Sequence, residues 1–304
     1  MELVLHTLFT QLMDASQKNF TPHTLYVVAT PIGNLADLTI RALAAFNRAD
    51  IICAEDTRLT GNLLRTYGIQ VKKLVSLREH NEQKMAERVI HWLTQGLIVV
   101  QVSDAGTPAI ADPGARLAKT VQLAGFRICP IPGACAIVTA LSASGLTTPS
   151  FLFHGFLPAK STERRQQLAQ WRTTPLLVVC YEAPHRIIAT LKDSITELGS
   201  ERILLLAREL TKTFETIKTL PAGEMLQWMN ANTQQQRGEI VLIIDAAPAK
   251  KYHNELDEAT LRTLRTLAHE LPTKQAVNLT AKLTGANKKT LYDYALTLKQ
   301  ADNG

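Results

Sequence analysis

The sequence predicts an α/β protein: two α/β domains, and a small helical segment at the C-terminal end. The first observation is that short, β-branched apolar runs alternate with segments of helical periodicity, which is typical of sheets covered by helices. The second is the length of 304 residues, which suggests about two domains. The third is an apolar fraction of 46%, enough for sizeable cores.

A first, largely parallel domain is predicted over residues 23–148. Its strands are expected where apolar residues run almost continuously, at 25–29, 50–54, 72–77, 97–102 and 127–131. Apolar residues at helical spacing predict helices that include Leu35, Met85 and Leu117, and an alanine-rich helix near 134–144. Residues 1–22 show neither a basic start nor a cleavage site, and we expect a flexible extension outside the fold.

A second domain, of mixed α/β type, is predicted over residues 149–247, because turn-forming residues cluster from Gly145 to Ser150. Its strands are expected at 151–156, 176–181, 202–207, 213–219 and 239–245. Its helices are expected at 161–171, 185–198 and 222–231.

Residues 248–304 are expected to form a helical appendage. Two short helices around Gly285 indicate helix-turn-helix packing. Packing alone explains this pattern, and contact with nucleic acid is the alternative, favoured by Lys282, Lys288 and Lys289.

Charge and cysteine content narrow the classes of function. A net charge of +6 modestly favours an anionic partner such as nucleic acid. The four cysteines have neither CxxC nor metal-ligand spacing, which predicts buried free thiols, no metal site and a reducing cytoplasm. No segment approaches the ~20 continuous apolar residues that a membrane helix requires.

A loop of small, turn-forming and acidic residues follows the predicted strand 97–102. Residues 103–114 read SDAGTPAIADPG. Because open α/β sheets bind ligands at the carboxyl ends of their strands, this loop predicts a ligand site. A connection that only shapes the backbone is the alternative. Asp112 is expected to cap the next helix, with Pro113 at its first position.

Two further loops leave the same edge of the predicted sheet, TPIGNL at 30–35 and EDTR at 55–58, which makes a cleft the natural expectation. The common signatures of other enzyme classes are absent from the sequence. It contains no GxGxxG after the first strand, no GxxxxGK[ST] and no GxSxG, which argues against dinucleotide-binding, P-loop and serine-hydrolase chemistry.

Six motifs, in this order along the chain, resemble the tetrapyrrole-methylase superfamily. They are TPIGNL at 30–35, EDTR at 55–58, HNE at 80–82, SDAGTP at 103–108, PIPG at 130–133 and ARELTK at 207–212. The resemblance runs from about residue 24 to 245. It is closest to those members that methylate small-subunit ribosomal RNA, whose C-terminal part resembles residues 273–299.

The resemblance implies that S-adenosylmethionine lies between the two domains and that its methyl group goes to a cytidine 2′-oxygen near the decoding region of 16S ribosomal RNA. It also implies a cytoplasmic homodimer whose partner is this RNA or the 30S subunit, with neither DNA nor a membrane involved. The cofactor-binding residues that it implies are Pro31, Ser103, Asp104, Ala105, Gly106, Ile110, Ala111, Tyr181, Glu182, Leu210, Glu239 and Ile240.

A ribose hydroxyl is a poor nucleophile, so a proton acceptor near the cleft would accelerate transfer by roughly 10²–10⁴-fold. The candidate acceptors are Asp56, His80, Asp104 and Glu209. We predict that Asp56, Arg58 and His80 are catalytic, with Arg58 as a positioning group. An ion pair between Asp56 and Arg58 that only orders the loop is the alternative.

Basic residues at loop or helix starts of the second domain are predicted to contact RNA phosphates. They are Lys160, Arg164, Arg165, Arg186, Arg208 and Lys212. Each of them alone is also consistent with a solvated surface charge. Two alternative functions share the predicted fold: methylation of a tetrapyrrole carbon, and non-catalytic RNA binding by an assembly factor.

Overall fold

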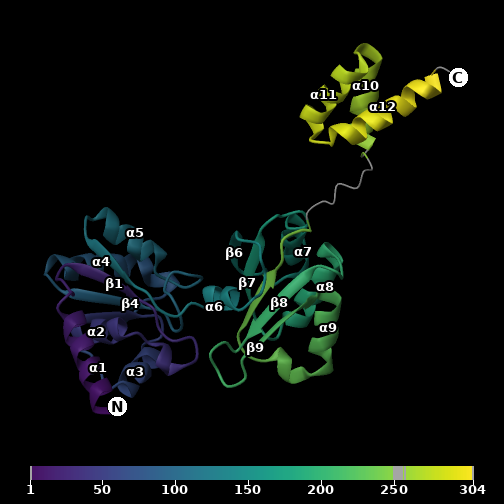
Figure 1. Ribbon diagram of the computed structural model, residues 1–304. Coiled ribbons are helices and arrows are strands. Elements are labelled where there is room, and N and C mark those ends of the chain that lie inside the picture. Colours follow the sequence, from purple (N-terminus) through teal and green to yellow (C-terminus); the bar gives the residue numbers. More distant parts are fainter. Residues whose placement is uncertain (1, 249–255, 257, 303–304) are drawn as a thin grey trace. The chain divides into compact units, whose positions relative to one another are not determined.

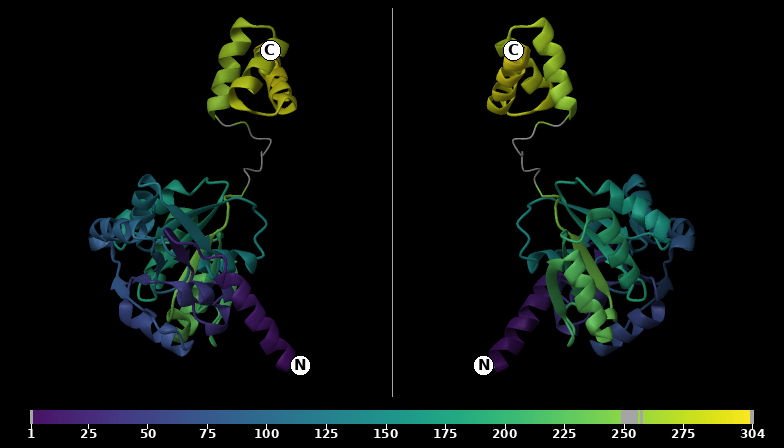
Figure 2. Two further views of the ribbon diagram at one scale, coloured as in Figure 1. Left: turned by 90° about the vertical axis from the view of Figure 1, so that its left-hand side faces the viewer. Right: turned by 90° about the vertical axis from the view of Figure 1, so that its right-hand side faces the viewer.

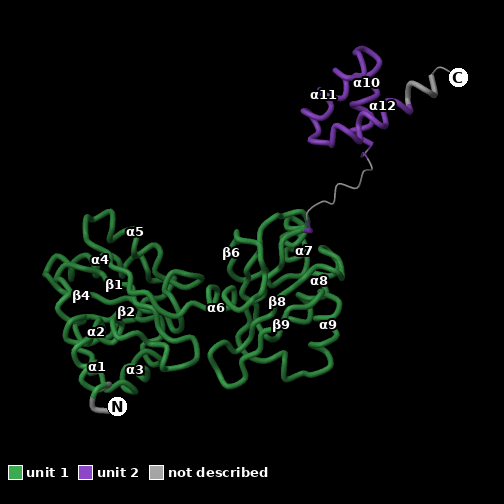
Figure 3. The backbone as a smooth tube through the Cα atoms, viewed as in Figure 1, with its two compact units in different colours: residues 1–247 green, residues 248–304 purple. Residues whose placement is uncertain are grey.

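The computed structural model of the chain describes residues 2–248, 256 and 258–302 (Figure 1). The chain divides into a main unit, residues 1–247, and a C-terminal unit, residues 248–304 (Figure 3). Within the predicted appendage, residues 249–255, 257, 303 and 304 lie outside the described residues. No helix of the described chain is long and apolar enough to cross a membrane.

The first sheet of the main unit is entirely parallel, with strand order β3-β2-β4-β1-β5. Its strands are β1 (Thr24–Val28), β2 (Ile51–Ala54), β3 (Leu74–Ser76), β4 (Ile98–Val102) and β5 (Arg127–Ile131). Every residue of β2 and β4 is buried, as their continuous apolar sequence predicts. The direction of the connections reverses between β4 and β1, which is where parallel sheets open a crevice for ligands.

Helices cover both faces of this sheet, since separate apolar cores lie on its two sides. They are α2 (Ile40–Arg48), α3 (Thr57–Thr66), α4 (Glu82–Thr94) and α5 (Ala115–Leu123), with short 3₁₀ turns η1 (Leu35–Asp37) and η2 (Glu79–Asn81). Helix α3 is absent from the prediction, because only Thr60 and Leu64 of it are buried. Helix α5 begins after Pro113 and not at it, which corrects the predicted start.

The second sheet is mixed, with order β6-β7-β10-β8-β9. Only β6 and β7 pair in parallel; the other neighbours are antiparallel. Its strands are β6 (Phe151–Phe156), β7 (Leu177–Glu182), β8 (Ile203–Arg208), β9 (Thr216–Pro221) and β10 (Ile240–Ile244). One face packs on α7 (Ser161–Gln170), α8 (Ile187–Leu198) and α9 (Ala222–Ala231), which is followed by η3 (Thr233–Gln236).

Helix α6 (Ala136–Ser142) connects the two sheets and covers the other face of the second one. Its Ile137 and Ala140 pack with Val179 and Leu205 of that sheet. Ile32, from the loop after β1, belongs to the same apolar cluster. The first and second domains therefore share a core at the place where the cleft is predicted.

Residues Glu2–Gln17 form helix α1, where the sequence predicts a flexible extension outside the fold. Met13 packs against the core of the first domain, while Val4 and Leu8 are exposed. Figure 2 shows the first turns of α1 projecting from the rest of the main unit. The apolar side of its last turns is what attaches this helix.

The C-terminal unit contains α10 (Glu258–Glu270), α11 (Thr273–Thr284) and α12 (Lys288–Asp302). They enclose a small core that includes Leu264, Val277 and Leu291. Gly285 ends α11 with a φ of +73°, in the left-handed region that glycine adopts most easily. The predicted pair of helices around Gly285 is confirmed.

Candidate functional site

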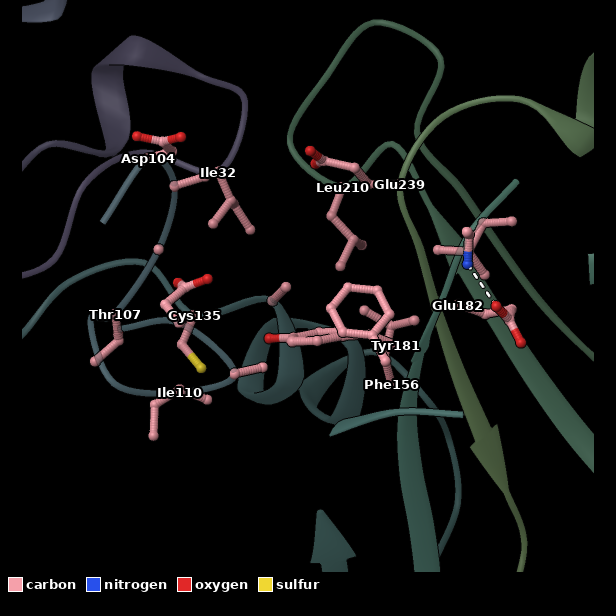
Figure 4. Close-up of a pocket in the computed structure, with 18 of the residues that line it drawn as sticks. Ile32, Asp104, Thr107, Ile110, Cys135, Phe156, Tyr181, Glu182, Leu210 and Glu239 are labelled. Carbon is pink, nitrogen blue, oxygen red and sulfur yellow. Dashed lines mark hydrogen bonds between the residues drawn. The ribbon is translucent and has the colours of Figure 1, made fainter. Parts of the chain in front are cut away.

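A cavity of about 440 Å³ lies where the loops after β1 and β4 face the second sheet (Figure 4). Figure 4 shows Ile32, Asp104 and Ile110 on one side and Tyr181 and Leu210 on the other. The predicted cofactor-binding residues that line it are Asp104, Ala105, Gly106, Ile110, Ala111, Tyr181, Glu182, Leu210, Glu239 and Ile240. The main chain thus brings together most of the predicted site.

Two of the predicted cofactor residues, Pro31 and Ser103, are not among those that line the cavity. Ser103 is buried, and its hydroxyl donates to the carbonyl oxygens of Ala105 and Gly106 at 3.3 and 3.4 Å. The buried Ser103 side chain therefore stabilises the turn and does not line the cavity. The residue after Pro31, Ile32, reaches the cavity in its place.

The loop after β4 has an unusual backbone. Gly106 has a φ of +76° and exchanges two hydrogen bonds with Thr30, with N···O distances of 2.9 and 3.0 Å. Ala109 and Ala111 also lie in the left-handed region, at φ of +67° and +64°. Such a conformation costs an alanine about 1 kcal/mol or more, and it recurs where a backbone is shaped around a ligand.

The end of this loop is held by residues of other elements. Glu82 of α4 is buried, and its Oε1 accepts the N–H groups of Gly114 and Leu117 at 3.0 and 2.8 Å. Glu82 is therefore the cap of α5, which corrects the prediction that Asp112 has this role. Gln101 of β4 donates to the carbonyl of Pro113 at 3.4 Å, a long contact.

Asp112 does not cap the helix, and it lines the cavity together with Glu55 and Asp104. Burial, and then the negative charges of Glu55 and Asp104, raise the pKa of Asp112 to about 6, although a hydrogen bond from Ser103 opposes the shift. Burial and Asp104 also raise the pKa of Glu55. Three carboxyls in one cavity create a site that favours a positively charged ligand.

The opposite wall comes from the second domain. Glu182 is buried and its carboxylate is fully engaged, by Arg186 at 2.6 Å, Thr190 Oγ1 at 2.6 Å and the N–H of Ala183 at 2.7 Å. Burial raises the pKa of Tyr181, whose ring lies 5.4 Å from that of Phe156. This wall of the cavity therefore consists of aromatic rings and of a carboxylate whose charge Arg186 neutralises.

The two domains also touch at the edge of the cavity. The N–H of Asn34 donates to Thr211 Oγ1 at 3.0 Å. A Cβ at Gly33 would lie 2.5 Å from Cγ of Lys212, so a larger residue would displace the Lys212 side chain. Lys212 is bound in turn by Glu209 and Glu239, at 2.9 and 3.2 Å.

The predicted catalytic residues lie outside the cavity lining. Asp56 caps α3: its Oδ1 accepts the N–H groups of Arg58 and Leu59, and its Oδ2 pairs with the Arg58 guanidinium at 2.9 Å. These bonds, above all that to the Arg58 side chain, hold the pKa of Asp56 well below its usual range. His80 is exposed in η2. The alternative interpretation, an ion pair that orders the loop, describes Asp56 and Arg58 as the structure has them.

The predicted RNA-binding cations fall into two groups. Arg164 and Arg208 are buried, and bonds to Asp193 and to loop carbonyls occupy their guanidinium groups. This contradicts their predicted contact with phosphate, because neither can leave its partners without disrupting the local fold. Arg186 and Lys212 are bound at the cavity, whereas Lys160 and Arg165 remain accessible beside Glu163 and Glu197.

Several cavity residues are missing from the prediction. They are Ile32, Glu55, Thr107, Asp112, Cys135, Ala136, Phe156, Ala183, Pro184 and Val241. Ile32, Glu55 and Thr107 stand inside recognised motifs, and Asp112 belongs to the same loop as Thr107. Reading every residue of the loops 30–35, 55–58 and 103–114 as a candidate would have found the acidic group.

Comparison with known families identifies two segments. Residues 24–226 match the family described as tetrapyrrole (corrin/porphyrin) methylases. Residues 254–299 match the family described as the RsmI C-terminal HTH domain.

Two relatives named ribosomal RNA small subunit methyltransferase I illustrate the similarity. The protein of Neisseria meningitidis serogroup B is 54% identical over 276 residues, which cover 91% of this chain and 94% of the relative. That of Escherichia coli O157:H7 is 47% identical over 272 residues, covering 90% and 94%.

Solved structures with the same fold are more distant. Diphthine synthase superposes with a TM-score of 0.56 at 14% identity, covering 73% of this chain and 89% of its own. The uroporphyrin-III C-methyltransferase of Thermus thermophilus gives 0.51 at 19% identity, covering 74% and 95%. At these identities the likeness concerns the fold alone.

Proposed function

Because the chain belongs to the tetrapyrrole methylase family, in the branch of the ribosomal RNA small subunit methyltransferases I, we propose that it methylates a cytidine ribose 2′-oxygen of 16S ribosomal RNA near the decoding region. S-Adenosylmethionine is the proposed methyl donor. The observation that carries the proposal is the acidic cavity at the reversal of strand order, lined by both domains of the main unit.

The residues of the cavity fit this donor. About 440 Å³ falls within the usual range for small-molecule sites. Carboxyls of Asp104, Asp112 and Glu55 suit a ligand that carries positive charges on sulfur and on its amino group. When bound, S-adenosylmethionine supplies a methyl group that its cationic sulfur makes reactive. The left-handed loop offers backbone N–H and carbonyl groups for the remaining contacts.

Methyl transfer requires an in-line approach of the ribose oxygen, and positioning by the two domains can provide much of the acceleration. A proton acceptor is the second contribution. We propose Asp104 for this role, because it alone of the four candidate acceptors lines the cavity. Its Oδ1 accepts the N–H of Asp56 at 2.8 Å, which fixes the carboxylate at the start of α3.

We expect Asp104→Asn to reduce kcat by roughly 100-fold, because the amide keeps an oxygen for the Asp56 N–H but cannot take up a proton. The dissociation constant of the donor, measured by calorimetry, should change by less than about tenfold. Asp56→Asn is the matched control: asparagine caps helices equally well, so activity should persist. Full activity of Asp104→Asn would refute this assignment.

The affinity for S-adenosylmethionine should rise with pH through about 6, the pKa of Asp112, because only the ionised carboxylate attracts the cation. The free energy of unfolding should change in the opposite direction as the pH rises. The folded protein keeps a proton that the unfolded chain releases near pH 3.8, so the free energy of unfolding falls between these two pH values. Asp112→Asn should flatten both profiles and weaken binding at pH 8 by roughly 10- to 100-fold. Asp14→Asn on α1 serves as the control, and an unchanged affinity profile of Asp112→Asn would contradict the prediction.

We further propose that the protein is a cytoplasmic homodimer. Strand β6 is at the edge of the second sheet, and Phe151 and Leu152 on it, like Val138 of α6, are exposed. An apolar edge strand of this kind is typically covered by another chain. All four cysteines are free thiols, which suits a reducing compartment. The accessible Lys160 and Arg165 remain our candidates for contacts with RNA phosphates.

Transfer of a labelled methyl group to isolated 30S subunits, followed by nuclease digestion and mass spectrometry, tests the proposed function. The expected product is 2′-O-methylcytidine. A label on a base atom would overturn the ribose assignment, and a label on a porphyrinogen would favour the tetrapyrrole alternative. Binding of the donor without any transfer would favour the non-catalytic assembly factor.

A further inference from the structure

A loop at the edge of the cavity presents an exposed phenylalanine. Leu210 lines the cavity, and Phe214, four residues later, is 72% exposed. Four residues of chain span at most about 14 Å, which bounds the distance between the Cα atoms of Leu210 and Phe214. It is more exposed than Phe9, Phe151 or Phe156. We expect an exposed apolar ring at this position to be covered by a binding partner.

The loop that carries Phe214 is fixed from beneath by the buried Arg208, which is 7% exposed. Nη1 of Arg208 donates to the carbonyl of Phe214 and to Thr216 Oγ1, both at 3.2 Å. Its Nε donates to the carbonyl of Arg237 at 3.0 Å. One guanidinium thus holds the backbones of Phe214 and Arg237 side by side, and a preorganised surface loses little entropy on binding.

The chemistry of this surface fits an unpaired nucleobase. Single-stranded nucleic acids are bound by aromatic rings that stack on bases beside cations that contact phosphates. Arg237 and Lys218 are both exposed, and neither forms a salt bridge within the part of the chain that the structure describes. A second copy of the chain is the competing occupant. Thr213 and Glu215 on either side of the ring are polar and exposed, which does not suit the apolar centre of such an interface.

We propose that Phe214 stacks on an unpaired base of the RNA, next to the nucleotide that enters the cavity, and that Arg237 contacts the adjoining phosphate. This proposal rests on the proposed function, which supplies the RNA substrate. It adds a binding site outside the cavity, where Arg208, which the sequence predicts to contact RNA itself, instead positions Phe214.

The test compares Phe214→Ala, Phe214→Trp and Phe9→Ala. For Phe214→Ala we expect the KM for 30S subunits, and the dissociation constant of a decoding-region RNA in filter binding, to rise roughly 5- to 100-fold. The affinity for S-adenosylmethionine should stay unchanged, because Phe214 does not line the cavity. Phe214→Trp should bind RNA as the wild type does, with its added indole fluorescence quenched. Phe9→Ala on α1, another exposed phenylalanine, should behave as the wild type.

Unchanged RNA affinity of Phe214→Ala would overturn the proposal. A change of oligomeric state without a change in RNA affinity would also overturn it, and would assign the ring to a second copy. If the wild type transfers no methyl group, the proposed function fails, while the binding comparison still decides the role of Phe214.

Discussion

Replacing Arg164 with alanine is expected to lower the free energy of unfolding by about 3–5 kcal/mol, because it leaves a partly buried carboxylate without its partner. Arg164 pairs with Asp193 at 2.6 Å, and the side-chain exposures of the two residues are 3% and 13%. Nη1 of Arg164 also donates to the carbonyls of Pro158 and Ala159, both at 3.1 Å. This cation therefore ties the start of α7 to α8 and to the loop before it.

Urea unfolding followed by circular dichroism measures this effect. Arg165→Ala is the matched control, since the neighbouring Arg165 is half-exposed beside Glu197 and should contribute less than about 1 kcal/mol. Removing both buried charges, in Arg164→Met with Asp193→Leu, should recover part of the loss. If Arg164→Ala were as stable as Arg165→Ala but bound RNA more weakly, the result would support a direct contact between Arg164 and RNA.

Replacing Gly114 with alanine is expected to lower the free energy of unfolding by about 2–4 kcal/mol and to weaken S-adenosylmethionine binding by at least roughly tenfold. Gly114 has a φ of +130°, and an added Cβ would lie 1.6 Å from Nε2 of Gln101. Gln101 is fully buried in β4 and cannot swing away. The loop 103–114 would have to shift, and with it the wall of the cavity.

Gly125→Ala provides the comparison for Gly114→Ala. Gly125 has a similar left-handed backbone, with φ of +81°, but no atom within 4 Å of an added Cβ. Gly125→Ala should lower the free energy of unfolding by about 1 kcal/mol and leave the affinity for S-adenosylmethionine unchanged. Adding Gln101→Ala to Gly114→Ala should restore part of the affinity, because it removes the overlapping atoms. Calorimetry that gave Gly114→Ala the wild-type affinity would contradict this account.

The sequence predicts the strands and the ligand loop well, because both depend on local patterns. The β-branched run 97–102 and the small residues after it need no distant partner to be recognised. The start of α5 could not be found in this way, since its cap comes from Glu82, more than 30 residues earlier. The burial of Arg208 cannot be predicted for the same reason: its acceptors lie on loops that only the folded chain brings together.

The site residues divide in the same way, into those that local sequence patterns predict and those that depend on contacts in the folded chain. Motif recognition gives the edge of the sheet at which the cavity lies, and most of its lining. It does not separate carboxylates that face the cavity from those that face the backbone. Asp56 and Asp104 look alike in sequence, yet both oxygens of Asp56 are occupied in capping α3 and pairing with Arg58, whereas Asp104 accepts the N–H of Asp56 and lines the cavity.

Strand order also governs when the chain can fold during its synthesis. In the first sheet β4 lies between β1 and β2, so β1 has no sheet neighbour before residue 102 has been made. In the second sheet β10 separates β7 from β8, and it is the last strand of the main unit. Until β4 and β10 are made, β1 has no partner, and the pairs β6–β7 and β8–β9 stay separate, an incomplete state that is prone to aggregation. Nascent chains truncated before residue 240 would leave the second sheet without its central strand.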